Sequence, residues 1–119
     1  MARKILIVDD AQTDRSNLEK IVSEAGHMTL LAESGVQAIE KALREQPDMI
    51  LMDVNMPDMD GFAATRKLKA DDATKHIPVV FVSSKDQKAD KAWGQMLGAK
   101  GYVAKPYTDA QLLEQVRAL

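Results

Sequence analysis

The chain has 119 residues, of which 45% are hydrophobic and 29% are charged, an ordinary composition for one globular domain. Its formal net charge of −2 disfavours a general nucleic-acid binder, which carries a basic excess. The lack of cysteine excludes disulfides, zinc–thiolate sites and thiol catalysis. Because no apolar run approaches the ~20 residues of a membrane span and no signal-peptide pattern precedes the first strand-like run, we expect a cytoplasmic protein without a membrane partner.

Short apolar runs alternate with stretches of helical spacing along the whole chain. Ser34 and Thr108 have the pattern of helix N-caps, whereas Gly26, Pro47 and Gly98 are typical of helix ends. The predicted elements are a strand at 5–8, a helix through 18–25, a strand at 28–32, a helix through 36–43, a strand at 48–52, a helix through 62–68, a strand at 79–82, a helix at 87–97, a strand at 101–104 and a helix from 108 that buries Leu112, Val116 and Leu119.

This alternation predicts an α/β fold with a parallel sheet that helices cover on both faces. Right-handed crossovers narrow the topology to a flavodoxin-like (βα)5 doubly wound sheet with strand order 2-1-3-4-5. The elements account for residues 1–119 as one domain. In such sheets, ligands bind at the carboxyl ends of the central strands, so the residues that end the strands are the candidates for the site.

Three carboxylates follow two strands that are neighbours in this order. Asp9 and Asp10 end the first strand, and Asp53 ends the third. Three acids at one spot repel one another and raise at least one pKa unless a cation lies between them. Oxygen-only ligands favour Mg²⁺ over zinc or copper. In the alternative interpretation, the first two acids only cap the following helix and the third belongs to a turn.

Two further polar residues leave strands at the same edge of the predicted sheet. Lys105 follows the fifth strand and has the charge to pair with a carboxylate or with a phosphoryl oxygen, and the Ser83 hydroxyl is a donor for the same group. An ordinary solvated lysine and a turn serine are the alternatives. Together with the acids and a metal, these side chains favour phosphoryl transfer onto an aspartate.

The motifs at 5–10, 51–57, 60–61, 77–83 and 98–106 together resemble response-regulator receiver domains over the whole chain. The resemblance is to the single-domain, CheY-like type. Within this type, Lys85-Asp86-Gln87, Asp90-Lys91 and Trp93-Gly94 look closer to PilH-type receivers of type IV pilus twitching motility.

The resemblance implies a role for each residue of the acidic pocket. Asp53 would be the phosphoacceptor, and Asp10 and Asp53 would bind Mg²⁺ directly. Asp9 would contribute mostly through water, and Asn55 would ligate through its backbone carbonyl. Lys105 would pair with the phosphoryl group, and its peptide bond to the following proline would be cis.

The resemblance also implies a switch. Ser83 would move toward the phosphoryl group, and Tyr102 would turn inward. The face made by the predicted fourth helix, fifth strand and fifth helix would then change shape. Ser83 stands where receivers often have threonine. Lys85 would lie where receivers vary and where phosphate lifetime is tuned. Its side chain would either hold the phosphoryl group or its attacking water, or be solvated.

We therefore expect a stand-alone, monomeric response regulator that accepts phosphate from a histidine kinase and binds a downstream protein, with no enzymatic turnover beyond its own phosphorylation and slow dephosphorylation. No output domain is expected because Leu119 falls within the predicted last helix. A phosphate sink, a haloacid-dehalogenase-like phosphohydrolase and a flavin carrier are the alternatives. His27 and His76 are expected at the surface, and Trp93 either anchors a partner or packs against the groove between the last two helices.

Overall fold

A computed structural model describes residues 2–85 and 87–119, so Asp86 of the 85–94 resemblance lies outside the described residues. Within them, five parallel strands form one sheet in the order β2-β1-β3-β4-β5, which confirms the predicted fold. The strands are β1 (Lys4–Val8), β2 (Met28–Ala32), β3 (Met49–Met52), β4 (Val79–Ser83) and β5 (Gly101–Ala104), and the helices are α1 (Gln12–Glu24), α2 (Gly35–Glu45), α3 (Gly61–Ala70), α4 (Lys88–Met96) and α5 (Asp109–Arg117).

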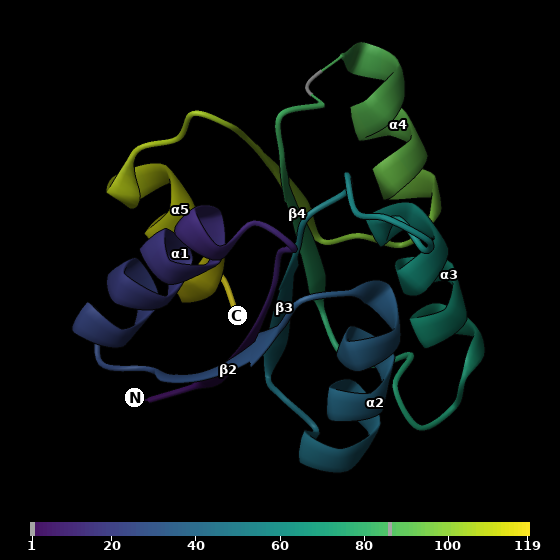
Figure 1. Ribbon diagram of the computed structural model, residues 1–119, viewed down its shortest axis with the longest axis horizontal. Coiled ribbons are helices and arrows are strands. Elements are labelled where there is room, and N and C mark those ends of the chain that lie inside the picture. The colour runs from purple at the N-terminus through teal and green to yellow at the C-terminus, as the bar shows by residue number, and fades with distance from the viewer. Residues whose placement is uncertain (1, 86) are drawn as a thin grey trace.

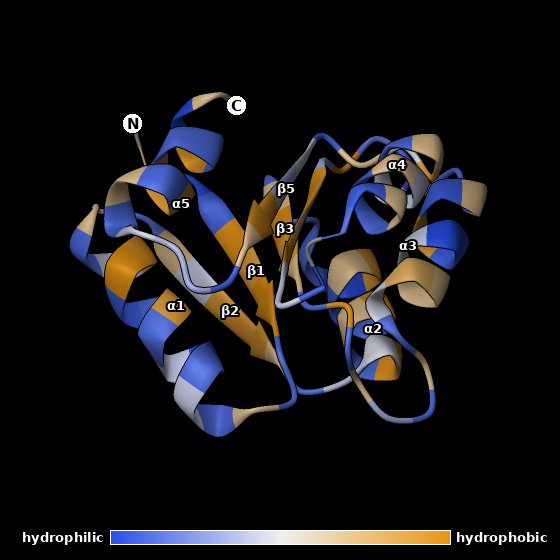
Figure 2. Ribbon diagram, turned by 90° about the horizontal axis from the view of Figure 1, so that it is seen from above, coloured by the Kyte–Doolittle hydropathy of each residue, from blue (hydrophilic) through white to orange (hydrophobic). Residues whose placement is uncertain are grey.

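The sheet lies between two helical layers, with α1 and α5 on one face and α2, α3 and α4 on the other (Figure 1). Successive side chains of a strand point to opposite faces, so each central strand feeds both cores. Ile5 and Ile7 pack in the cluster that includes Leu18 of α1, whereas Leu6 packs in the cluster that includes Phe81. This two-sided burial explains why the strands read as continuous apolar runs, seen in orange in Figure 2.

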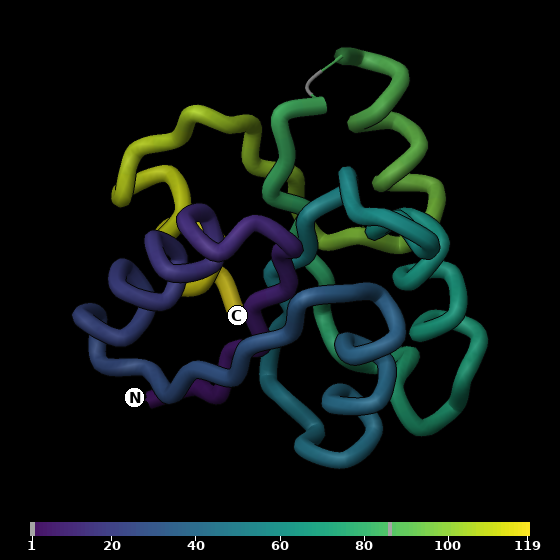
Figure 3. The backbone as a smooth tube through the Cα atoms, in the orientation of Figure 1, coloured from purple at the N-terminus to yellow at the C-terminus, as the bar shows by residue number. Residues whose placement is uncertain are grey.

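The register brings the ends of the central strands together. Val8 of β1 lies beside Met52 of β3, and the Asp53 N–H donates to the Val8 carbonyl at 2.9 Å. On the other side of β4, the Lys105 N–H donates to the Ser83 carbonyl at 2.9 Å. In Figure 3 the loops that follow these strands leave the sheet toward the upper side of the view. The residues expected to form the site therefore share one edge of the sheet.

The helix ends follow the predicted signals with one exception. The side chains of Ser34 and Thr108 cap α2 and α5 by accepting backbone N–H groups at the third residue along. Helix α5 ends at Arg117, so Leu119 is half-buried beyond the helix, and its prediction as a buried helical residue is wrong.

His76 is exposed as predicted, but His27 is half-buried. The Nδ1 atom of His27 accepts the Arg3 N–H at 3.0 Å, at the edge of the sheet where β1 and β2 begin. This edge is opposite the one where Asp9 and Asp53 lie. Among the described residues, no helix combines the length and the apolar character needed to cross a membrane.

Candidate functional site at the carboxyl edge of the sheet

The three acids that follow β1 and β3 converge on one pocket. Carboxylate oxygens of Asp9, Asp10 and Asp53 all lie within 4.8 Å of one another. Asp9 and Asp53 are 1% and 6% exposed, whereas Asp10 is exposed to solvent. Since an oxygen-only donor set with one open side is what Mg²⁺ prefers, the residues present fit a bound magnesium ion.

The electrostatics of Asp53 also favour a cation at this position. The pKa of Asp53 is raised from 3.8 to about 6, chiefly by burial and then by the charge of Asp9, against the opposing effect of Lys105. The raised pKa agrees with the repulsion predicted from the sequence. A divalent cation beside Asp53 would favour the ionised carboxylate and so oppose this shift.

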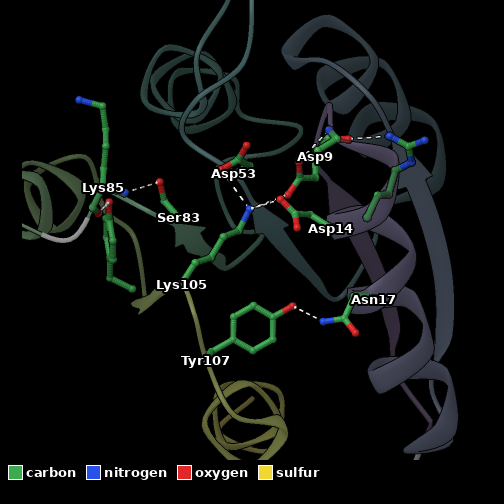
Figure 4. A network of polar contacts seen from close by, with 11 residues as sticks. Asp9, Asp14, Asn17, Asp53, Ser83, Lys85, Lys105 and Tyr107 are labelled. Atoms are coloured by element: carbon green, nitrogen blue, oxygen red, sulfur yellow. Dashed lines mark hydrogen bonds and ion pairs between the residues drawn. The ribbon is translucent and has the colours of Figure 1, made fainter.

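The Lys105 ammonium group lies among three carboxylates (Figure 4). Its Nζ atom is 2.9 Å from Asp9 Oδ2, 3.1 Å from Asp14 Oδ2 and 3.7 Å from Asp53 Oδ1. Burial lowers the pKa of Lys105, but the hydrogen bond to Asp9, the charge of Asp53 and the hydrogen bond to Asp14 raise it by more, so that it lies above its ordinary value. The lysine is therefore a permanent positive charge in the pocket.

Asp14 is the residue of this cluster that the sequence analysis missed. It lies in the first turn of α1, whereas the candidates predicted from the sequence were the residues at the ends of strands. A usable signal existed, because the first turn of the helix that follows β1 starts at the same edge of the sheet as Asp9 and Asp10. Its partner Lys105 is 91 residues away in the chain, a pairing that only the fold brings about.

Asp9 is fixed by both of its carboxylate oxygens. Oδ1 accepts the Ala11 N–H at 2.9 Å, and Oδ2 accepts from Lys105. The capping alternative considered for Asp9 is reflected in its bond to the N–H of Ala11, the residue before α1, but the same carboxylate also belongs to the pocket. Asp53 Oδ1, in contrast, lies 3.7 Å from Lys105 Nζ, beyond hydrogen-bonding distance.

Gly61, the first residue of α3, allows this helix to begin close to the backbone of Asp53. A Cβ atom on Gly61 would lie 2.1 Å from the Asp53 carbonyl oxygen, so no side chain fits there. Asp60 caps α3 by accepting the Ala63 N–H at 2.8 Å. Asn55, expected to ligate through its backbone, is exposed in the loop between β3 and α3. The beginning of α3 thus packs directly on the backbone of the candidate acceptor.

On the α4 side of the pocket, the backbone of one residue, Lys85, joins the predicted switch residues Ser83 and Tyr102. Ser83 is buried, and its Oγ accepts the Lys85 N–H at 3.1 Å. The Tyr102 hydroxyl donates to the Lys85 carbonyl, and the Tyr102 ring lies 5.8 Å from that of Phe81. Ser83 and Tyr102 are therefore connected through the backbone of Lys85, whose N–H and carbonyl each contact one of them.

The side chain of Lys85 points away from Asp53 (Figure 4). Its Nζ lies 4.0 Å from Asp90 Oδ1, and the side chain is 49% exposed, in agreement with the solvated alternative.

Trp93 is 38% exposed on α4, and the Arg66 guanidinium of α3 lies 5.7 Å from its ring centroid. This contact is with α3, whereas the groove interpretation expected packing toward α5. The Lys105–Pro106 peptide bond is cis as predicted.

The response regulator receiver domain matches residues 5–117. The chain belongs to this family. Receiver domains are signalling phosphoacceptors that bind Mg²⁺ in an acidic pocket, and here the acidic cluster lies at the carboxyl edge of the sheet.

Relatives of this receiver domain agree with the assignment over its whole length. It is 44% identical to the protein PilH of Pseudomonas aeruginosa over 119 residues, covering 100% of this chain and 98% of PilH. The structure of the chemotaxis protein CheY4 of Vibrio cholerae aligns with a TM-score of 0.92 at 29% identity, covering 99% and 98% of the two chains. The receiver domain of the sensor histidine kinase PA1611 of Pseudomonas aeruginosa has a TM-score of 0.90 at 28% identity, covering 99% and 97%, and that structure has a magnesium ion coordinated in its active-site cleft.

Proposed function

We propose that this receiver domain accepts a phosphoryl group on Asp53 from a histidine kinase in the presence of Mg²⁺ and passes the signal to a downstream protein. One observation carries the proposal: Asp53 is a buried carboxylate with a pKa raised to about 6, beside two further acids and a lysine. A buried acid with perturbed ionisation at a strand end is the pattern of a reacting group.

Asp9, Asp10, Asp53 and the backbone carbonyl of Asn55 would hold the metal. When bound, Mg²⁺ would neutralise negative charge on the oxygens of the transferred phosphoryl group. An Asp53 carboxylate oxygen forms the bond to phosphorus while the bond from phosphorus to the leaving group breaks, and the leaving group keeps the electron pair. The Lys105 ammonium and the Ser83 hydroxyl then donate to the phosphoryl oxygens.

The switch follows from the hydrogen bonds on the α4 side. When the Ser83 hydroxyl turns to the phosphoryl group, the Lys85 N–H loses its acceptor, and the loop that also holds the Tyr102 hydroxyl is free to move. Tyr102 then turns inward, and the face formed by α4, β5 and α5 changes shape. This is a two-state switch that a local charge biases.

Similarity to PilH favours a role in type IV pilus twitching motility, or in a related chemotaxis pathway. Residues 1–119 would then act as one receiver domain, monomeric and cytoplasmic, with a histidine kinase as donor and a protein target at the α4, β5 and α5 face. Deletion of the gene should impair movement on surfaces, and unchanged surface motility would remove the pilus assignment.

The acceptor is tested by intact mass after incubation with Mg²⁺ and acetyl phosphate. The parent protein should gain one phosphoryl group, and Asp53→Asn should gain none. Asp72→Asn is the matched control, because Asp72 is an exposed acid in the loop after α3, and it should react like the parent. Equal gains in all three proteins would place the acceptor elsewhere.

A further inference from the structure

Two contacts join the first half of α1 to the loop between β5 and α5. Lys105 Nζ donates to Asp14 Oδ2 at 3.1 Å, and Asn17 Nδ2 donates to the Tyr107 hydroxyl at 3.0 Å. Asp14 and Asn17 are three residues apart and so share one face of the helix. Figure 4 shows both side chains directed toward the loop. The loop that carries Lys105 is thus held to α1 at two points.

Within this arrangement, Lys105 is held on the α1 side of the pocket. Its distances of 2.9 Å to Asp9 and 3.1 Å to Asp14 are hydrogen bonds, whereas 3.7 Å to Asp53 is beyond hydrogen-bonding distance. The Lys105 side chain is 18% exposed and that of Asp14 is 49% exposed. The ammonium group therefore donates hydrogen bonds to Asp9 and Asp14, whereas its contact with the candidate acceptor Asp53 is a longer ion pair.

A phosphoryl group on Asp53 would compete with Asp14 for this ammonium. It adds a charge of roughly −1.5 to −2 and new acceptor oxygens beside Lys105. Asp14 opposes that addition in two ways, because it occupies one of the three N–H donors of the lysine and because its own negative charge repels the incoming group. Both effects act in the same direction, and removal of the Asp14 charge abolishes the repulsion and weakens the hydrogen bond that occupies the lysine donor.

We propose that Asp14 is a positioning residue that restrains Lys105 and thereby slows the phosphorylation of Asp53. This inference rests on the proposed function. In the reaction with acetyl phosphate, an Asp53 oxygen bonds to phosphorus while the bond from phosphorus to the acetate oxygen breaks, and acetate leaves with the electron pair. Lys105 stabilises the charge on the remaining phosphoryl oxygens to the extent that it is released from Asp14.

The test compares the initial rate of phosphorylation by acetyl phosphate with Mg²⁺ in four proteins, followed by intact mass. Asp14→Asn removes the charge and keeps the shape, and it should react about two- to fivefold faster than the parent, the size that a half-exposed ion pair supports. Asp14→Glu keeps the charge and should return the rate toward that of the parent. Glu24→Gln removes an exposed charge ten residues further along α1, about 15 Å away along the helix axis, and should match the parent.

Binding of beryllofluoride, a phosphoryl mimic, gives a second measurement. Unlike the phosphorylation rate, this measurement is not affected by loss of a phosphoryl group from Asp53. Its dissociation constant with Mg²⁺ should fall by about two- to fivefold in Asp14→Asn, in keeping with the strength of one half-exposed ion pair. A purely structural role for Asp14 predicts a loss of stability with an unchanged or slower rate, so a gain in both rate and affinity separates the two roles.

The outcomes distinguish the two proposals. If the parent is phosphorylated on Asp53 and Asp14→Asn reacts no faster than Glu24→Gln, the restraining role of Asp14 is overturned while the receiver function stands. If the parent neither gains a phosphoryl group nor binds beryllofluoride, the proposed function fails and the role of Asp14 fails with it.

Discussion

The two flanks of Asp53 are built from different interactions. The α1 flank consists of Asp9, Asp14, Asn17, Lys105 and Tyr107, and the α4 flank consists of Ser83, Lys85 and Tyr102. On the α1 flank, one ammonium group is shared among charged carboxylates. On the α4 flank, a buried hydroxyl and a phenol are held by the N–H and the carbonyl of one residue. One flank is governed by charge and the other by neutral hydrogen bonds.

This difference indicates how one chemical event can act in two directions. The α1 flank should respond to the charge of a group on Asp53, because its ion pairs depend on the local balance of charge. The α4 flank should respond to the position of acceptor atoms, because Ser83 Oγ, which accepts the Lys85 N–H, would move when its O–H donates to a phosphoryl oxygen. Changes to the ion pairs of the α1 flank should therefore depend on pH and metal, and changes on the α4 flank should not.

The largest effect is expected for Lys105→Met, which removes the shared ammonium group. In EDTA at pH 7.5 the free energy of unfolding should fall by about 3 kcal/mol, because buried carboxylates are left without their partner. Added Mg²⁺ should recover much of the loss, as a cation replaces a cation. Urea denaturation measures both values, with Lys88→Met, at an exposed lysine of α4, as the control. An equal loss in the control would show that the flank does not depend on this charge.

Asp53→Asn should increase the free energy of unfolding rather than lower it. The folded-state pKa of about 6 lies above the ordinary 3.8, so ionised Asp53 destabilises the fold, fully above pH 6 and not at all below about pH 4. In EDTA at pH 8 the variant should be more stable than the parent by about 2 kcal/mol. Thermal or urea unfolding across pH 4 to 8 measures the difference. A difference that does not change with pH would contradict the assigned cause.

On the α4 flank, Ser83→Ala should cost about 1 kcal/mol, because the Lys85 N–H loses its acceptor. Unlike the two changes above, this loss should be the same with EDTA and with Mg²⁺ and should not vary between pH 5 and 8. Ser84→Ala, at the exposed neighbouring serine, is the matched control and should be close to neutral. A marked dependence of the Ser83→Ala loss on metal would mean that the α4 flank is also governed by charge.

The smallest effect is expected for Tyr107→Phe, which removes the hydrogen bond from Asn17. Because this bond is exposed, the loss of stability should be about 0.5 kcal/mol. Burial raises the pKa of Tyr107, so the phenol stays neutral at ordinary pH and the loss should not change with pH. A double-mutant cycle with Asn17→Ala measures the coupling, and two additive single losses would show that the contact contributes nothing.

The sequence was sufficient to predict the order of the strands and the convergence of Asp9, Asp10 and Asp53, because periodicity and strand ends are local signals. It was not sufficient for Asp14, whose partner Lys105 is distant in the chain and whose helix position resembles that of any surface acid. The direction of the Lys85 side chain also remained open, since Asp90 and solvent compete with the pocket for it. Such side-chain choices depend on charges that only the folded chain brings together.

The central claim, that a group on Asp53 is sensed on both flanks, is tested most directly by the backbone amide NMR signals of Lys85 and Tyr107. Addition of beryllofluoride and Mg²⁺ should shift both signals in the parent and speed the exchange of the Lys85 amide hydrogen, as its acceptor Ser83 Oγ turns away. Asp53→Asn should show neither change. A Lys85 amide that keeps its shift and protection in the parent, or equal changes in Asp53→Asn, would contradict the account.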